Sequence, residues 1–383
     1  MIKKVLSLFT PGRDPMTITL DELERLVREA VDPRDVFGDD VPGNLERFLA
    51  VCRPDRNPGD ERRASAVADA LKRFAQFTPE DLQAIARAEA AFRAAGRAVD
   101  PPTAPAPSHS MEPAVLVGSP KRAYRLVRRL AVGDLTDVHL ARGEADGTNY
   151  VLKAARVPDA AEALETERRV LERIVRAAAE THYGRFFPAL VESFAVFDGA
   201  PKRVNVFRQV PNLYTLEQIH ARHPALDGRH LGWIFKRLLT AVGFAHGQGW
   251  LHGAVAPPHV LLDVEGHGLV LVGWGHSVEK GDRITSGPAR YADWYPPEVR
   301  RKDPARPATD VYMAARCMLY LAGGDPVSQS MPEAVPREMQ AFFRYCLLEG
   351  PKLRPGDAWS ALDDFDTILG RVYGAPRYHR LAM

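Results

Sequence analysis

From Tyr124 onward the chain passes through short strand-like runs and then, beyond Pro211, through long helical patterns. The strand-like runs include YRLVRRLAV and NYVLKAARV, and a single helical stretch over residues 160–178 interrupts them. Runs rich in valine and aromatic residues favour strands, whereas apolar residues three and four apart favour helices. This order predicts an α+β fold in two lobes, a strand-rich lobe over 121–210 and a helix-rich lobe over 211–375.

The residues before the strands have a different character. Residues 1–97 contain amphipathic helical patterns such as TITLDELERLVREAV, and residues 98–120 are dense in proline and small residues. A proline-rich stretch of this kind forms an extended connection and cannot build a core. We therefore predict a small all-helical domain over 1–97, a linker over 98–120 and, after the helix-rich lobe, a tail over 376–383.

Charge and cysteine content exclude several classes of protein. The 51 basic and 49 acidic side chains leave a formal charge of +2, which is no electrostatic footprint for nucleic acid or an anionic membrane. Cys52, Cys317 and Cys346 are scattered and odd in number, so neither a disulfide framework nor a zinc site is indicated. No apolar run has the length of a signal peptide core or a membrane span. We predict a cytoplasmic protein with no nucleic-acid or membrane partner.

A series of motifs in a fixed order runs through residues 124–373. LAVGDLTDVHLA takes the place of the glycine-rich loop, where Gly133 matches the middle glycine and Val138 matches the valine. Lys153 in YVLKAA matches the strand lysine that pairs with the ATP phosphates, and Glu167 in LETERRVLERI matches the glutamate that holds it. This part of the chain is similar to the protein-kinase family. The resemblance implies a bilobal kinase-like fold with nucleotide-binding residues at these four positions.

The catalytic loop of kinases reads H-R-D-L-x-x-x-N, and the matching stretch here is HGAVAPPHV. His252 matches the histidine, but Ala254 replaces the aspartate that takes the substrate proton and His259 replaces the asparagine that binds magnesium. In VLVGWG, Gly273 and Trp274 replace the first two residues of D-F-G. Loss of a base and of metal ligands removes large contributions to the rate. We therefore predict a pseudokinase, not an enzyme, with no catalytic residues and no metal.

The positions that support the helical lobe do match. Glu298 in WYPPEV corresponds to the glutamate of A-P-E, and Arg354 in EGPKLRPGDAW corresponds to the arginine that pairs with it. Asp310 matches the aspartate that receives backbone N–H groups of the catalytic loop, and His252 is expected to pack in the lobe. The resemblance thus implies a binding or scaffolding module for a protein partner, with weak ATP binding. We expect Trp274 to intrude on the nucleotide.

A second resemblance lies near the N-terminus. NLERFLAVCRPDRNPGDERRASAVADALKRF, at about residues 44–77, resembles the middle of a J-domain, in which an H-P-D loop joins two helices. Pro54 and Asp55 match that loop, and Arg53 stands in place of its histidine. The resemblance implies that Arg53, Pro54 and Asp55 contact a chaperone ATPase. The alternative is a helical hairpin with a proline turn and no chaperone contact.

Two other functions stay open beside the binding module. One is a co-chaperone adaptor, in which the N-terminal helices recruit a chaperone ATPase. The other is an atypical kinase or nucleotide transferase that uses relocated acids such as Asp263 and Glu265. His246, His252 and His259 recur every seven residues, but they belong to a helix, a strand end and a loop, so we predict no metal site from them.

Overall fold

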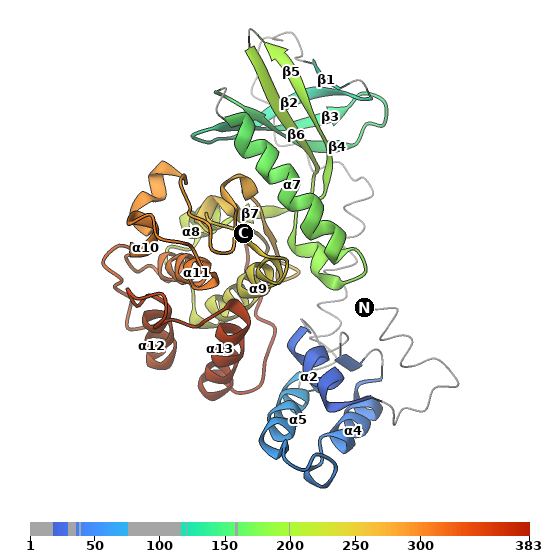
Figure 1. Ribbon diagram of the computed structural model, residues 1–383, viewed down its shortest axis with the longest axis vertical. Coiled ribbons are helices and arrows are strands. Elements are labelled where there is room, and N and C mark those ends of the chain that lie inside the picture. The colour runs from blue at the N-terminus through green and yellow to red at the C-terminus, as the bar shows by residue number, and fades with distance from the viewer. Residues whose placement is uncertain are drawn as a thin grey trace.

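The computed structural model describes residues 18–29, 36–37, 40–75, 116–119, 121–157, 160–198 and 200–383. Figure 1 shows a strand-rich lobe and a helix-rich lobe, together with a group of N-terminal helices. This confirms the predicted α+β fold in two lobes with a small helical part before it. Much of the predicted 98–120 linker, and the parts of 1–97 outside these ranges, lie beyond the described residues.

The strand-rich lobe is a six-stranded antiparallel sheet in the order β1-β2-β3-β4-β6-β5. Its strands are β1 (Leu116–Gly118), β2 (Ala123–Val132), β3 (Thr136–Gly143), β4 (Asn149–Ala155), β5 (Leu190–Asp198) and β6 (Ala200–Arg208). Tyr124, Tyr150, Leu152 and Phe194 form an apolar core in this lobe. Helix α7 (Ala160–Ala178) lies along the sheet (Figure 1) and presents Leu164, Glu167 and other buried residues at helical spacing.

Strand β1 departs from the sequence-based boundaries, because Leu116–Gly118 belonged to the predicted linker. In the structure Leu116 pairs with Arg125 and Gly118 pairs with Ala123 in an antiparallel register. Pro113 and Pro120 flank this strand, but Leu116–Gly118 themselves contain no proline and have backbone N–H groups for a ladder. The strand-rich lobe therefore begins a few residues earlier than the composition indicated.

The helix-rich lobe is built around α9 and α11, whose side chains are buried on almost every side. Asp227 caps α9 by accepting a hydrogen bond from the Arg229 backbone, and Asp357 caps α13 through the N–H groups of Trp359 and Ser360. The helices are α8 (Leu216–Arg222), α9 (Gly228–Gly247), α10 (Pro297–Arg300), α11 (Pro307–Leu321), α12 (Arg337–Cys346) and α13 (Ala358–Tyr373).

Short strands and turns carry the segments that matter for the site. Strands β7 (Leu213–Thr215), β9 (Val260–Asp263) and β10 (Gly268–Leu271) form one small sheet, and β8 (Trp250–Leu251) pairs with β11 (Val278–Glu279). The 3-10 turns are η3 (His182–Phe186), η4 (Pro257–His259), η5 (Trp274–His276) and η6 (Ala289–Trp294). The apolar core of this lobe includes Val170, Leu171 and Ile174 of α7, so this helix also packs against the helix-rich lobe.

The N-terminal helices form a small unit with its own core. They are α2 (Leu20–Glu29), α4 (Val41–Val51), the turn η2 (Pro54–Arg56) and α5 (Glu61–Ala75). Leu23, Phe37, Phe48 and Leu71 are buried in this core, and Arg63 of α5 forms ion pairs with two acidic residues of α2. Among the residues that the structure describes, no helix combines the length and apolarity needed to cross a bilayer.

Candidate functional site

Lys153 and Glu167 meet where β4 faces α7. The Lys153 ammonium nitrogen lies 2.8 Å from Glu167 Oε1. The Glu167 side chain is only 2% exposed and that of Lys153 is 18% exposed, so the pair is shielded from most of the solvent. Val138 of β3 is directly opposite Lys153 across the β3–β4 ladder. The structure thus brings together three of the four residues predicted to bind nucleotide.

Gly133, the fourth of these residues, lies in the tight turn between β2 and β3. Its backbone N–H donates to Thr136 O at 2.8 Å, and its carbonyl accepts from the Arg156 guanidinium at 2.8 Å. A β-carbon at Gly133 would lie 3.1 Å from Thr136 O, a tight contact that a side chain would relieve only by a small shift of the turn. Because the N–H of Gly133 is already bonded inside the turn, it is not available to a phosphate oxygen in this conformation.

Asp310 organises the segment that corresponds to the catalytic loop. Its fully buried carboxylate accepts hydrogen bonds from the backbone N–H groups of His252 at 2.8 Å and Gly253 at 2.9 Å, and from His246 Nε2 at 2.9 Å. Burial by itself would raise the pKa of Asp310, but the hydrogen bond and charge interaction with His246 contribute to a net lowering. Asp310 is therefore ionised, and its carboxylate holds the loop through these hydrogen bonds.

Gly253, which replaces the arginine of the kinase loop, has no room for a side chain. Its φ is +72°, and a β-carbon there would lie 2.5 Å from His276 O. His252 is fully buried next to it, where its Nδ1 accepts from the Ala254 N–H at 3.2 Å and its Nε2 donates to Val272 O at 2.9 Å. Burial lowers the pKa of His252, and these two bonds require its neutral form.

His259 and Gly273 occupy the positions where kinases carry the two magnesium ligands, and here they contact each other. His259 Nδ1 donates to Ala254 O at 2.7 Å, and a β-carbon on Gly273 would lie 2.6 Å from the His259 ring. Burial lowers the pKa of His259 to about 3, so the ring is neutral. Ala254, His259 and Gly273 thus meet without a carboxylate, and the described residues contain no cluster of three or more potential metal ligands.

Trp274 lies in the core of the helix-rich lobe, which corrects our expectation that it would intrude on the nucleotide. Its side chain is fully buried, and its indole Nε1 donates to Leu271 O at 2.7 Å. The ring packs on Phe187 at 5.6 Å and on His252 at 4.6 Å between ring centroids. Gly273 has a φ of +86°, and the indole that follows it reaches apolar neighbours and a carbonyl acceptor inside the lobe.

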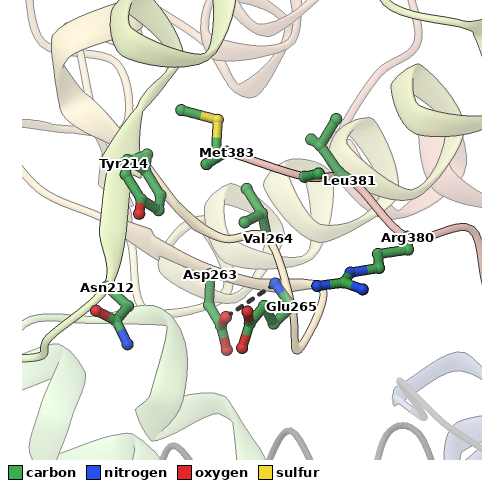
Figure 2. Close-up of a pocket in the computed structure, with 9 residues that line it drawn as sticks. Asn212, Tyr214, Asp263, Val264, Glu265, Arg380, Leu381 and Met383 are labelled. Atoms are coloured by element: carbon green, nitrogen blue, oxygen red, sulfur yellow. Dashed lines mark hydrogen bonds between the residues drawn. The ribbon is translucent and has the colours of Figure 1, made fainter. Parts of the chain in front are cut away.

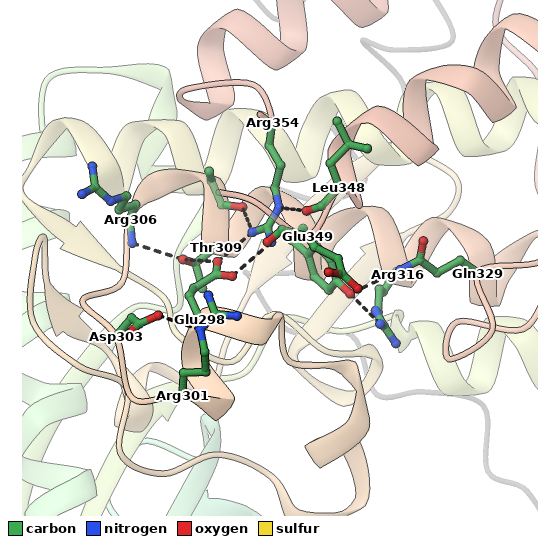
Figure 3. A network of polar contacts seen from close by, with 12 residues as sticks. Glu298, Arg301, Asp303, Arg306, Thr309, Arg316, Gln329, Leu348, Glu349 and Arg354 are labelled. Atoms are coloured by element: carbon green, nitrogen blue, oxygen red, sulfur yellow. Dashed lines mark hydrogen bonds and ion pairs between the residues drawn. The ribbon is translucent and has the colours of Figure 1, made fainter. Parts of the chain in front are cut away.

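The predicted pair of Glu298 and Arg354 is a buried, two-bond ion pair. The guanidinium Nη1 and Nη2 atoms lie 2.7 Å and 3.0 Å from the two carboxylate oxygens (Figure 3). Thr309 donates to the same carboxylate at 3.1 Å, and the Arg354 guanidinium lies 4.5 Å from the ring of Tyr312. Arg354 also donates to the backbone carbonyls of Leu348 and Glu349. The pair ties the start of α10 to the loop before α13.

Of the candidates for relocated acids, Asp263 is the last residue of β9 and Glu265 lies in the turn between β9 and β10. Asp263 Oδ1 accepts from the Glu265 N–H at 3.2 Å and from the Gly266 N–H at 3.0 Å, as in an ordinary turn cap. Both residues line a pocket of about 220 Å³ together with Tyr214 and Arg380 (Figure 2). Neither has a hydrogen bond or ion pair with Lys153 in the structure.

The loop that resembles H-P-D joins α4 to α5 in the N-terminal helical unit. Arg53 Nε lies 3.0 Å from Asp55 Oδ1, and both side chains are more than half exposed. Pro54 begins the turn η2, and the Asn57 amide donates to Val51 O at 2.7 Å and to Arg53 O at 2.9 Å. Arg53 therefore turns onto the aspartate of its own loop.

Asn205 belongs to the site but was missed in the sequence. It is fully buried on β6, where its amide nitrogen lies 3.1 Å from Glu167 Oε2. The signal was present, because an asparagine inside the apolar run RVNVF is unusual for a buried strand. Only the fold shows that Asn205 contacts Glu167, 38 residues earlier in the chain.

Comparison with known proteins finds kinases. The chain is 30% identical over 118 residues to serine/threonine-protein kinase F of Synechocystis, a match covering 28% of this chain and 23% of that kinase. It is 22% identical over 253 residues to sperm motility kinase 3A of Mus musculus, covering 61% and 47%. It is 28% identical over 158 residues to a casein kinase I homologue of Encephalitozoon cuniculi, covering 40% and 45%. No protein-family model matches the chain.

These relatives correct one of our predictions. The sequence led us to expect that the chain is not an enzyme, and this is contradicted because every one of these relatives is named a kinase. The chain spans less than half the length of each relative. With the two-lobed α+β architecture, the comparison shows that the chain has a protein-kinase-like fold.

Proposed function

We propose that this kinase-like protein acts as a binding module, which takes up ATP weakly beside Lys153 and holds a protein partner. The observation that carries the proposal is the pair of Lys153 and Glu167, formed at 2.8 Å with Val138 opposite the lysine. An ammonium group held by one carboxylate keeps further N–H donors for phosphate oxygens.

The three cysteines are free and buried, which supports a reducing, cytoplasmic location.

The site supports weak binding that does not depend on magnesium. The N–H of Gly133 is bonded within its own turn, so the backbone cradle for phosphates is reduced. His259 and Gly273 offer no carboxylate at the positions where magnesium would be held, and this cation prefers oxygen ligands. Lys153 then carries most of the compensation for the charge of the triphosphate.

Replacing Lys153 with alanine is expected to weaken ATP binding by about 10- to 100-fold. A hydrogen bond to a charged group contributes about 1.5–3 kcal/mol, and tenfold in affinity corresponds to about 1.4 kcal/mol. Isothermal titration with ATP, with and without magnesium, measures the change. Lys121→Ala, which removes an exposed lysine of the same lobe, is the control and should bind as the unaltered chain does. Tight binding that requires magnesium, or equal binding by Lys153→Ala, would contradict the proposal.

A second candidate function is phosphoryl transfer from ATP to a protein hydroxyl, with release of ADP. The relatives favour it, because they are named kinases. To test for phosphoryl transfer, the unaltered chain and Lys153→Ala are incubated with ATP labelled in its γ-phosphate and a generic protein substrate. Label that accumulates with the unaltered chain and disappears with Lys153→Ala identifies a transferase. Absence of label with measurable ATP binding supports the binding module.

We propose a chaperone ATPase as the protein partner, contacted by Arg53, Pro54 and Asp55 in the loop between α4 and α5. The carboxylate of Asp55 is engaged in an ion pair with Arg53. Replacing Arg53 with histidine should release this carboxylate for contact with a partner. We expect Arg53→His to increase stimulation of a chaperone ATPase severalfold, measured as phosphate release. The control is Arg53→Ala, which also frees Asp55 but supplies no imidazole. Equal, null results for both variants would exclude this partner.

A further inference from the structure

We propose that Asn205 is a positioning residue that keeps Glu167 directed at Lys153 whether or not a nucleotide is bound. This inference rests on the proposed function, because it concerns how the ATP-binding lysine is held. It adds a residue that the kinase resemblance does not supply. Asn205 places a single buried amide between the sheet and α7.

Lys153 and Asn205 are direct partners across neighbouring strands. The register of the β4–β6 ladder places them opposite each other, so both side chains emerge on the same face of the sheet. Glu167 of α7 accepts a hydrogen bond from each of them. Its Oε1 accepts from Lys153 at 2.8 Å, and its Oε2 accepts from Asn205 Nδ2 at 3.1 Å. One carboxylate is therefore bound by side chains of two strands, the charged ammonium group of Lys153 and the neutral amide of Asn205.

The amide of Asn205 also binds the backbone of α7. Its Nδ2 donates to Leu164 O at 2.9 Å, one helical turn before Glu167. Because both neighbours are acceptors, the amide nitrogen must face them, and this assigns the orientation of the side chain. The other end of the amide, Oδ1, is buried without a hydrogen-bond partner among the described groups. An apolar side chain here would leave the buried Glu167 Oε2 and Leu164 O without this donor, so the two bonds of Nδ2 offset the unpaired Oδ1.

With this arrangement, the position of Glu167 does not depend on whether Lys153 is bonded to Glu167 or to a phosphate. An ammonium group that turns towards phosphate oxygens would loosen its hold on Glu167, but the bonds from Asn205 to Oε2 and to Leu164 O would remain. The carboxylate would stay within reach of the lysine. Asn205 thus keeps Lys153 and Glu167 paired before ATP binds, so that ATP binding is not needed to form the pair.

The test uses the full chain with Asn205→Leu and Asn205→Asp. Leucine removes both hydrogen bonds from a site of similar volume, and aspartate turns a second carboxylate towards Glu167. The first readout is the rate at which an amine-reactive acylating reagent labels Lys153, followed by mass spectrometry. The second is hydrogen exchange of residues 160–178. Neither readout requires nucleotide, so the inference remains testable even if ATP does not bind and the proposed function fails.

We expect Lys153 in Asn205→Leu to be labelled at least threefold faster, its α7 amides to exchange at least threefold faster, and its ATP binding to be at least threefold weaker. In Asn205→Asp we expect faster exchange of α7 but no faster labelling, because the new carboxylate lies opposite Lys153 and favours its protonated form. Asn44→Leu is the matched control, because Asn44 is another buried asparagine whose amide donates to a backbone carbonyl, that of Phe37, and it should leave Lys153 unchanged. In a Glu167→Gln background, Asn205→Leu should change Lys153 labelling no further. Wild-type labelling of Lys153 in folded Asn205→Leu, or an additional effect in that background, would overturn the proposal.

Discussion

Replacing Arg354 with alanine is expected to lower the free energy of unfolding by about 3–5 kcal/mol, because Glu298 would be left as a buried charge without its partner. Glu298 is 1% exposed and Arg354 is 3% exposed, so water cannot take the place of the guanidinium. The carbonyls of Leu348 and Glu349 would lose their donor as well. Equilibrium unfolding in urea measures the change as a shift of the transition midpoint.

The chain offers a matched control for this prediction. Arg301 and Asp303 form an ion pair at 2.9 Å, but both side chains are about half exposed (Figure 3). Exposed pairs contribute about 0–1 kcal/mol, since solvent screens them. Arg301→Ala should therefore unfold almost as the unaltered chain does. If Arg354→Ala is no more harmful than Arg301→Ala, the buried pair does not brace this lobe.

Replacing Gly273 with aspartate alone is expected to destabilise the protein, because the His259 ring occupies the space that a side chain needs. A β-carbon at this position would lie 2.6 Å from two atoms of that ring. Overpacking costs about 1–3 kcal/mol, and a buried carboxylate without a partner adds a comparable amount. In the double variant with His259→Asn, the smaller amide has to rotate away from position 273 to relieve the clash, which a ring held by its neighbours does less readily. We expect a coupling of at least about 1 kcal/mol between the two substitutions.

Two further measurements sharpen this double-mutant cycle. Gly281 has a φ of +95° with open space around it, so Gly281→Asp reports the cost of left-handed backbone without a clash. The double variant also places aspartate and asparagine oxygens where kinases bind magnesium, and we expect its ATP binding to become magnesium-dependent. Additive destabilisation by the two substitutions, measured in urea, would show that His259 does not block position 273.

Several site residues could be predicted from spacing because the kinase pattern links residue type to order along the chain. Lys153 and Glu167 are 14 residues apart, and the strand and helix between them have lengths that bring them together. Glu298 and Arg354 are 56 residues apart and still meet, since the helices between them return the chain to α10. The absence of acids at Ala254, His259 and Gly273 was equally plain in the sequence, but the three relatives described above are named kinases.

Order and periodicity along the chain were sufficient for the two lobes, the helical unit before them and the pairing of charged residues that follow a known spacing. Packing in three dimensions settled the rest: Trp274 turned into the core, His259 covered Gly273, Leu116–Gly118 joined the sheet, and Asn205 met Glu167. The physical reason is that a repeat pattern indicates which face of an element is buried. Which side chain fills the opposite space depends on volumes and hydrogen-bond geometry from distant segments.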